Sequence, residues 1–174
     1  MWSLAIQTMI RYYNGEFREV AEIFHSAVHE TAASCYSQEQ IEAWAPTPID
    51  IEHWRSRCEL KKPFLCSHAG QTVGFLELDT DGHIDCHYVH PSHNRRGFGS
   101  ALLLHAITTA ADFGMTKLYV EASHIAKDLY LKHGFQVVSS NQVSIGDINL
   151  ANWIMEMPLA NKAIQADALG AADL

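Results

Sequence analysis

Two glycines and two arginines occur together where a predicted helix begins. Residues 95–100 read Arg-Arg-Gly-Phe-Gly-Ser and follow an extended stretch that ends at Val89-His90-Pro91. Gly97 and Gly99 have no side chains, so the unbonded amides of the first helical turn can approach an anion closely. The helix dipole favours negative charge at this end, and the two arginines add countercharge. The pattern predicts a pyrophosphate-binding loop.

Two other interpretations of the loop stay open. A dinucleotide-binding fingerprint also has paired glycines, but it requires a third glycine and an acidic residue at the end of the next strand, about 20 residues on. The third glycine is absent, whereas Glu121 does end the next predicted strand. The dinucleotide interpretation is thus weakened and not excluded. A tight loop that binds no ligand is the second alternative.

Titratable side chains are concentrated on the strand before the loop. His83, Asp85 and His87 alternate there, and a period of two places them on one face. Together with His90 and His93, these histidines raise a metal-binding module as an alternative function. His83 and His87 would lie about 13 Å apart along a strand, too far to share one ion, and only a turn could bring His90 and His93 together. No metal is therefore expected.

The loop is positioned by a predicted crossover between two strands. An apolar helical face runs through residues 97–113, and residues 117–122 are typical of a short strand. Strand, helix and strand in this order predict a parallel crossover. Ser123 is predicted to cap a last helix that ends at His133, and two strands follow, at residues 135–145 and 148–157.

The first half of the chain predicts the remaining elements. Extended stretches at residues 64–68, 72–78 and 83–90 predict three antiparallel strands. A strand at 6–12 and helices at 17–28, 37–44 and 51–60 precede them. We expect an α/β fold of the α+β type, with a mixed, mostly antiparallel seven-stranded sheet flanked by helices. It forms one domain at residues 1–158, followed by a C-terminal extension at 159–174.

Composition restricts the classes of function. The chain has 174 residues, 48% of them hydrophobic, which suits one core. A net charge of -8 opposes binding to nucleic acid, because that affinity depends on Lys and Arg, and it suits an amine-bearing partner. Four irregularly spaced cysteines, no signal peptide and no run of about 20 apolar residues predict a cytoplasmic protein that does not bind membranes.

The loop and its strand resemble the GCN5-related N-acetyltransferase (GNAT) family. The coenzyme A loop of that family reads Gln or Arg, two variable residues, Gly, one variable residue, and Gly or Ala, after a strand that ends in Val-x-Pro. Val89-His90-Pro91 and Arg95-Arg96-Gly97-Phe98-Gly99 match, while Asn94 stands where Gln or Arg is usual. The order of elements matches from about Ile10 to Leu159. Residues 36–45 further resemble the YafP-type subgroup of bacterial acetyltransferases.

The resemblance implies an enzyme that uses acetyl-CoA as a co-substrate. The pantetheine arm would pair with the main chain in a gap of the sheet, beside the parallel crossover, and the loop would hold the pyrophosphate. Tyr36 and Trp44 would lie at the acceptor site. The coenzyme-binding residues implied in this way are His87, Tyr88, Val89, Arg95, Arg96, Gly97, Phe98, Gly99, Ser100, Ser123 and Lys127, although the Asn usual near the last two is absent.

Tyr130 is the predicted catalytic acid. It begins the segment Tyr-Leu-Lys-His-Gly-Phe, similar to a family segment whose Tyr protonates the leaving sulfur. A phenol with a pKa of about 10 can donate to a thiolate whose acid has a pKa of about 8.5. The alternative is a tyrosine that only packs helix against sheet.

The catalytic base is left open among three residues. The family often places a base four or six residues before the Val of the loop motif, and Asp85 and His83 occupy these positions. Glu121, at the end of the strand beside the gap, is the third candidate.

The expected function is acetyl transfer to a primary amine of a small molecule or peptide. The alternatives are transfer to an alcohol or a protein amine, and a non-catalytic coenzyme A-binding regulator. A nucleic-acid or membrane partner is not expected, and a homodimer is compatible with the sequence.

Overall fold

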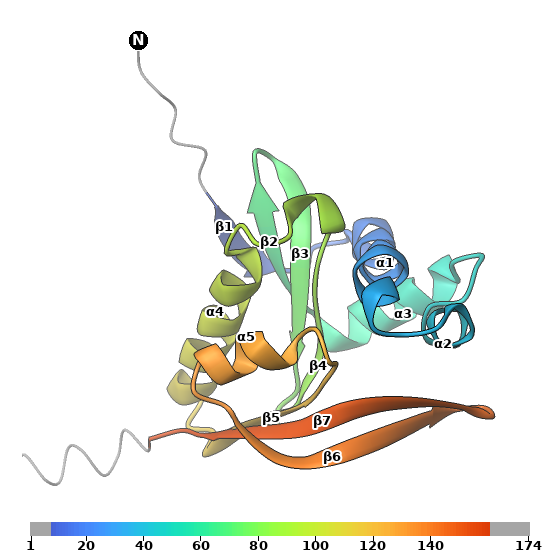
Figure 1. Cartoon of the computed structure of the whole chain (residues 1–174). Coiled ribbons are helices and arrows are strands. Elements are labelled where there is room, and N and C mark those ends of the chain that lie inside the picture. The colour runs from blue at the N-terminus through green and yellow to red at the C-terminus, as the bar shows by residue number, and fades with distance from the viewer. Residues whose placement is uncertain (1–7, 161–174) are drawn as a thin grey trace, which may run out of the picture.

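The computed structural model describes residues 8–160, which form one domain (Figure 1). In chain order its helices and strands are β1 (Met9–Tyr12), α1 (Phe17–Ser26), α2 (Gln38–Trp44), α3 (Ile51–Lys61), β2 (Phe64–His68), β3 (Gln71–Leu78), β4 (Ile84–Val89), α4 (Phe98–Asp112), β5 (Lys117–Ala122), α5 (Lys127–Lys132), β6 (Gln136–Ile145) and β7 (Ile148–Pro158). A π-helical turn, Ala27–Thr31, continues α1. No helix in residues 8–160 is long and apolar enough to cross a bilayer.

The seven strands form two antiparallel groups that meet at one point. The first has the order β1-β2-β3-β4 and the second β5-β7-β6. A single parallel bridge joins His83, just before β4, to Tyr119 of β5. At this point the Tyr119 amide donates to the Gly82 carbonyl at 3.0 Å. The predicted mixed sheet with one parallel crossover is thus confirmed, and β4 and β5 enclose a gap that is closed at Gly82 and open toward Val89.

Helices cover both faces of the first strand group (Figure 1). On one face α4 buries Leu102, Leu103 and Ala106 against Leu76 and Ile84. On the other face α1 and α3 contribute buried side chains to a second core, among them Val20, Ala21, Ile23, Trp54 and Cys58. Each of the two cores therefore fixes one face of β4, the strand from which the site is built.

A bulge in β4 changes which side chains share a face. Two residues, Asp85 and Cys86, oppose the single residue Glu77 of β3. An extra residue reverses the alternation of the side chains that follow it. Asp85 consequently contacts α3, whereas His87 contacts α4. The prediction of one shared face for alternate residues from 83 to 89 is therefore wrong.

Most predicted elements agree with the structure to within two residues, and one predicted cap does not. The Ser37 hydroxyl accepts from the Gln40 amide, and the Gln40 side chain accepts from the Ser37 amide, so the two residues form a capping box at the start of α2. Ser123 does not cap α5, because its hydroxyl accepts from the Ala126 amide at 3.3 Å in the turn before the helix. Residues 161–174 of the predicted extension, and residues 6–7 of the first predicted strand, lie outside the described residues.

Candidate active site

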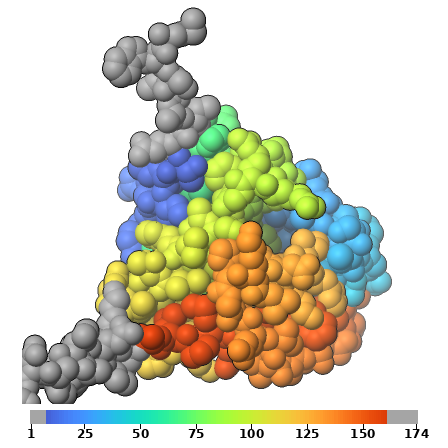
Figure 2. All heavy atoms as spheres, turned by 60° about the vertical axis from the view of Figure 1, so that its left-hand side comes forward, coloured from blue at the N-terminus to red at the C-terminus, as the bar shows by residue number. Residues whose placement is uncertain are grey.

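A cavity of about 580 Å³, here called the loop cavity, opens beside the predicted pyrophosphate loop. Its walls are the π-helical turn, residues 87–89 of β4, the loop with the first turn of α4, and the segment that leads into α5. Figure 2 shows a recess where these segments meet at the surface. Among the predicted coenzyme-binding residues, the lining includes His87, Tyr88, Val89, Arg95, Gly97, Phe98, Gly99, Ser100 and Ser123.

Gly97 gives the loop its shape at the start of α4. It is the N-cap residue, with a left-handed φ of 89° that favours glycine, and no atom lies within 4 Å of the place where a Cβ would stand. The first helical bond runs from the Ala101 amide to the Gly97 carbonyl, so the amides of residues 98–100 have no acceptor within the helix. Open space and free amides are what an anion at a helix N-terminus requires.

The polar side chains of the loop take different directions. Arg95 lines the loop cavity, whereas Arg96 donates to Nε2 of His68 at 3.1 Å and does not line it. Asn94 donates to the Thr31 hydroxyl at 2.9 Å and so ties the loop to the π-helical turn. The short amide that replaces the usual Gln or Arg therefore has a structural contact. Lys127, also predicted to bind coenzyme, instead lies over the Trp153 ring at 3.5 Å.

Tyr130 and His87 are joined by a hydrogen bond beneath the loop cavity. Nε2 of His87 lies 3.0 Å from the Gly99 carbonyl, and Nδ1 lies 3.0 Å from the Tyr130 hydroxyl. Because a carbonyl only accepts, Nε2 carries the proton and Nδ1 accepts from Tyr130. Burial lowers the pKa of His87 to about 4 and raises the pKa of Tyr130 far above its usual value. At neutral pH both groups are uncharged, with the Tyr130 proton directed at His87.

The three candidate bases are close to one another, because His83 lies beside Asp85 and also binds Glu121. Asp85 accepts from Arg57 at 2.7 Å and pairs with Lys61 at 2.9 Å. Burial alone would raise the Asp85 pKa, but these cations outweigh it and lower the pKa. His83 and Glu121 bind each other, with 2.6 Å between Nε2 and Oε2, and neither lines a described cavity.

A second cavity of about 450 Å³, here called the aromatic cavity, adjoins the loop cavity. Trp44 and Tyr88 line both. Phe24 and Trp54 complete the aromatic wall, and Asp85 is the one candidate base in the lining. Tyr36, predicted for the acceptor site, lines neither of these two cavities: its hydroxyl donates to the Ala151 carbonyl at 2.9 Å, and its ring packs against Trp44. Tyr36 therefore contacts the aromatic cavity only indirectly, by packing against Trp44.

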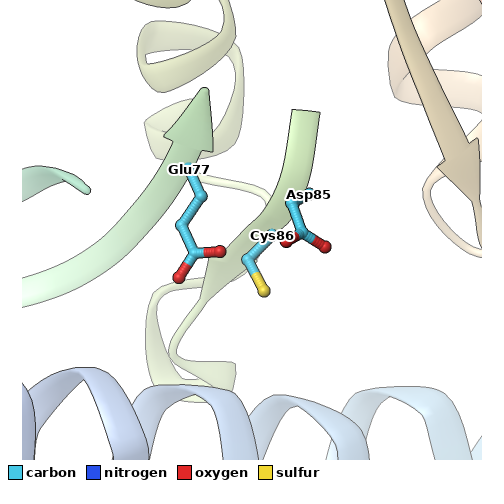
Figure 3. A group of neighbouring side chains, drawn as sticks. All are labelled: Glu77, Asp85 and Cys86. Atoms are coloured by element: carbon cyan, nitrogen blue, oxygen red, sulfur yellow. The ribbon is translucent and has the colours of Figure 1, made fainter. Parts of the chain in front are cut away.

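An acidic group under the aromatic cavity has the spacing of metal ligands but is filled by a side-chain cation. Glu77 extends from β3, and Asp85 and Cys86 extend from β4, with ligand atoms within 4.8 Å of one another (Figure 3). Arg57 donates to Glu77 through Nε and Nη2, and Nη2 also reaches Asp85 and Cys86. The Arg57 guanidinium therefore occupies the position that a metal ion would take. Likewise, Lys61 bonds Asp79 and Asp85 of the group Asp79, His83 and Asp85.

The histidines near the loop bind a serine. His90 and His93 each place Nδ1 within 2.9 Å of the Ser92 hydroxyl, and their ring centres are 6.2 Å apart. The turn does bring the two rings together, as the sequence allowed, and their facing nitrogens are engaged by one hydroxyl.

Several lining residues of the aromatic cavity have no signal in the sequence. They come from α1, from the segment after α2 and from α3: Phe24, His25, Asp50, His53 and Arg57. They are spread over more than 30 positions and share no motif. The one available sign was the family resemblance, which pointed to Tyr36 and Trp44, and of these two Trp44 lines the cavity.

Comparison with known proteins agrees with this geometry. The acetyltransferase (GNAT) domain family matches residues 32–155. The uncharacterized N-acetyltransferase YafP of Escherichia coli K12 is 33% identical over 144 residues, which cover 83% of this chain and 91% of that protein. A crystal structure of a GCN5-related N-acetyltransferase from Rhodopseudomonas palustris has a TM-score of 0.83 and 31% identity, covering 91% of this chain and all of the other.

A more distant structure shares the fold. PaiA N-acetyltransferase from Thermoplasma acidophilum, solved in complex with coenzyme A, has a TM-score of 0.70 and 20% identity, covering 88% of this chain and 99% of that one. The resemblance predicted from the loop is confirmed by the family match and by the two closer relatives. The chain belongs to the GNAT family of N-acetyltransferases.

Proposed function

We propose that this acetyltransferase moves the acetyl group of acetyl-CoA directly to a primary amine of a small molecule or peptide. The observation that carries the proposal is the junction of two cavities at Trp44 and Tyr88. One cavity contains the features of a pyrophosphate site, and the other has aromatic and acidic walls. Two substrates that meet at this junction can react without a covalent enzyme intermediate.

The loop cavity fits coenzyme A. The free amides of residues 98–100 and the Arg95 side chain supply donors and charge for the pyrophosphate. Beyond the bridge at His83, β4 pairs with β3 alone among the described strands, so its other edge faces the gap. A pantetheine arm has amides that can pair with such an edge, in the manner of an added strand.

The reaction requires one bond to form and one to break. The uncharged amine nitrogen attacks the thioester carbonyl, the C–N bond forms and the C–S bond breaks. Nitrogen gives its surplus proton to water, and sulfur takes a proton from Tyr130, whose hydroxyl turns from Nδ1 of His87 and then regains a proton from water. Because burial keeps Tyr130 protonated, the donor is present throughout the working pH range. The same burial makes the phenol a weaker acid, so its proton moves as negative charge develops on sulfur and not before.

Asp85 has the role of holding the amine and not of deprotonating it. Its lowered pKa makes it a weak base and a persistent anion on the wall of the aromatic cavity. His83 and Glu121 are bound to each other outside both linings. The amine therefore loses its proton to water in the open cavity before it attacks.

The test is release of free thiol from acetyl-CoA in the presence of a panel of amines, with identification of the acetylated product by mass spectrometry. Thiol release above the rate of spontaneous hydrolysis, together with an N-acetylated product, is the expected result. Tight acetyl-CoA binding with no acetylation of any amine, alcohol or peptide would overturn the proposal in favour of a non-catalytic coenzyme binder.

A further inference from the structure

The walls of the aromatic cavity suit a cation. Phe24 lies 4.8 Å from Trp54 and 5.0 Å from Tyr88, measured between ring centres, and Trp44 lies 6.5 Å from Tyr88. The four rings line one space. The faces of aromatic rings attract ammonium groups, most strongly where water is excluded.

The network of charges around Arg57 and Lys61, beside the cavity, leaves one negative charge uncompensated. Arg57, the one Lys or Arg in its lining, is bound through Nε and Nη2 to the fully buried Glu77. Burial raises the Glu77 pKa above its usual value, and the two bonds from Arg57, which favour the carboxylate, offset only part of this rise. Lys61 bonds both oxygens of Asp79 at 2.8 and 2.7 Å. Asp85 is the third carboxylate beside these two cations, so the network carries a surplus anion.

Two carboxylates in the lining retain an oxygen for a ligand. Asp85 binds its two cations through Oδ2, and within residues 8–160 no donor reaches its Oδ1. Asp50 accepts from the His53 amide through Oδ1 at 2.9 Å, and in the same part of the chain its Oδ2 has no partner. His25 adds no positive charge at neutral pH, since burial and the neighbouring His29 lower its pKa. Both aspartates line the aromatic cavity.

We infer that the acceptor is a small amine with a second cationic group, of the aliphatic diamine or polyamine class. One nitrogen, uncharged, meets the thioester at Trp44 and Tyr88. The other, as an ammonium, lies among the rings and is bound by Asp50 and Asp85. An amine with a carboxylate in place of the second nitrogen would be repelled by the same two aspartates. The inference rests on the proposed amine acetylation and specifies its substrate.

Three acceptors of equal chain length test it with the wild-type chain: butane-1,4-diamine, butan-1-amine and 4-aminobutanoate. At saturating acetyl-CoA, we expect kcat/KM to be about 10-fold higher for the diamine than for the monoamine, and lowest for the amino acid. Equal values for the diamine and the monoamine, or a preference for the amino acid, would overturn the inference and leave amine acetylation intact.

Asp50→Asn removes one charge and keeps the oxygen that caps α3. We expect it to reduce the ratio of diamine to monoamine kcat/KM by about 5-fold. Glu52→Gln is the matched control, because Glu52 lies on the same helix, pairs with Arg55 at 3.8 Å and does not line the cavity. This variant should keep the wild-type ratio. An unchanged ratio in Asp50→Asn, or an equal reduction in both variants, would contradict a direct role for Asp50.

Calorimetry separates failure of this inference from failure of the proposed function. Butane-1,4-diamine is titrated into the wild-type and Asp50→Asn chains, each saturated with coenzyme A. Binding that Asp50→Asn weakens, without acetylation of any of the three amines, would support the cation site and count against amine acetylation. Acetylation without a preference for the diamine would support amine acetylation and count against the cation site. If the chain neither binds the diamine nor acetylates any of the amines, both the cation site and amine acetylation are overturned.

Discussion

The hydroxyl of Tyr130 donates its proton to Nδ1 of His87 across 3.0 Å. The other nitrogen of His87 donates to the carbonyl of Gly99, in the first turn of α4. One side chain of β4 thus connects the predicted acid on α5 to the helix whose N-terminus faces the loop cavity. Because His87 is uncharged and its tautomer is fixed, it holds the phenol in one orientation.

Tyr130→Phe should separate catalysis from coenzyme binding. The phenyl ring keeps the contact with Phe135, whose ring centre is 5.0 Å away, and only the hydroxyl is lost. We expect kcat to fall about 100-fold, in the range found for general acids, while the Kd for acetyl-CoA changes less than about 2-fold. Thiol release and calorimetry provide the two measurements.

Tyr13→Phe is the control for this substitution. Tyr13 is also buried, and its hydroxyl donates to Glu59 at 3.1 Å, away from both cavities. The control should retain the wild-type kcat. A Tyr130→Phe chain with wild-type turnover would remove the hydroxyl from the mechanism.

His87 should make the fold sensitive to acid. Its pKa is about 4 in the folded chain, against about 6.5 for an unfolded histidine, so between these values the unfolded state binds a proton that the native state does not. Stability is therefore lost as the pH falls from about 6.5 toward 4. Between pH 7 and 5 the loss from this group is about 2 kcal/mol.

Urea denaturation of the wild type and of His87→Gln at pH 7 and 5 measures that contribution. Carboxylates titrate in both chains, so their contribution to the change in the free energy of unfolding cancels in the comparison. The free energy of unfolding should fall by about 2 kcal/mol less in His87→Gln than in the wild type. Parallel decreases in the two chains would show that His87 is protonated equally in the folded and unfolded states.

Much of the fold was predictable because its signals are local. The Ser37–Gln40 capping box, the turn at Gly70 and the glycine at the start of α4 each act within a few residues, and these elements begin where the sequence indicated. The loop was predictable for the same reason. Its open space and free amides follow from residue types at adjacent positions.

The aromatic cavity and the orientation of β4 were not predictable in this way. The bulge at Asp85 and Cys86 interrupts a regular alternation without a glycine or proline to mark it, so the sequence placed Asp85 and His87 on one face. Arg57 and Glu77 are 20 positions apart, and their pairing depends on how α3 packs against β3. Contacts of this kind arise only from the tertiary fold.

Arg95 and Arg96 should differ in their effect on coenzyme binding. Arg95 lines the loop cavity, whereas Arg96 is bonded to His68 and stacked over Phe98, with 5.4 Å from its guanidinium carbon to the ring centre. We expect Arg95→Ala to weaken acetyl-CoA binding about 5- to 10-fold and Arg96→Ala by less than about 2-fold. Calorimetry at low and high salt measures both, and the reverse order would assign the phosphate contact to Arg96.

Arg57→Met should destabilise the chain more than a double substitution does. It leaves the carboxylate of Glu77, which is fully buried, without its partner, at a cost of about 3–5 kcal/mol. In Arg57→Met/Glu77→Met both charges are absent and apolar side chains fill the space, so most of that loss should be recovered. Urea denaturation tests the pair. A double variant as unstable as the sum of the two single variants would show that the residues act independently.

Gly82 holds the closed end of the gap between β4 and β5, and its replacement should be more damaging than that of another turn glycine. A Cβ at Gly82 would lie 2.2 Å from the Lys117 carbonyl oxygen, and its φ is 91°. Gly70 has a similar φ of 79°, with no atom within 4 Å of its Cβ position. Gly70→Ala therefore reports backbone strain alone, at about 1 kcal/mol.

Gly82→Ala adds a backbone clash to the same strain, so the strands must separate where the Tyr119 amide bonds the Gly82 carbonyl. We expect a loss of about 3 kcal/mol or more in the free energy of unfolding, together with weaker acetyl-CoA binding, because the width of the gap depends on this contact. Equal losses for the two alanine variants would mean that the strands can shift at this end without cost. In that case the geometry of the gap would be set by the packing of α4 and not by the bridge.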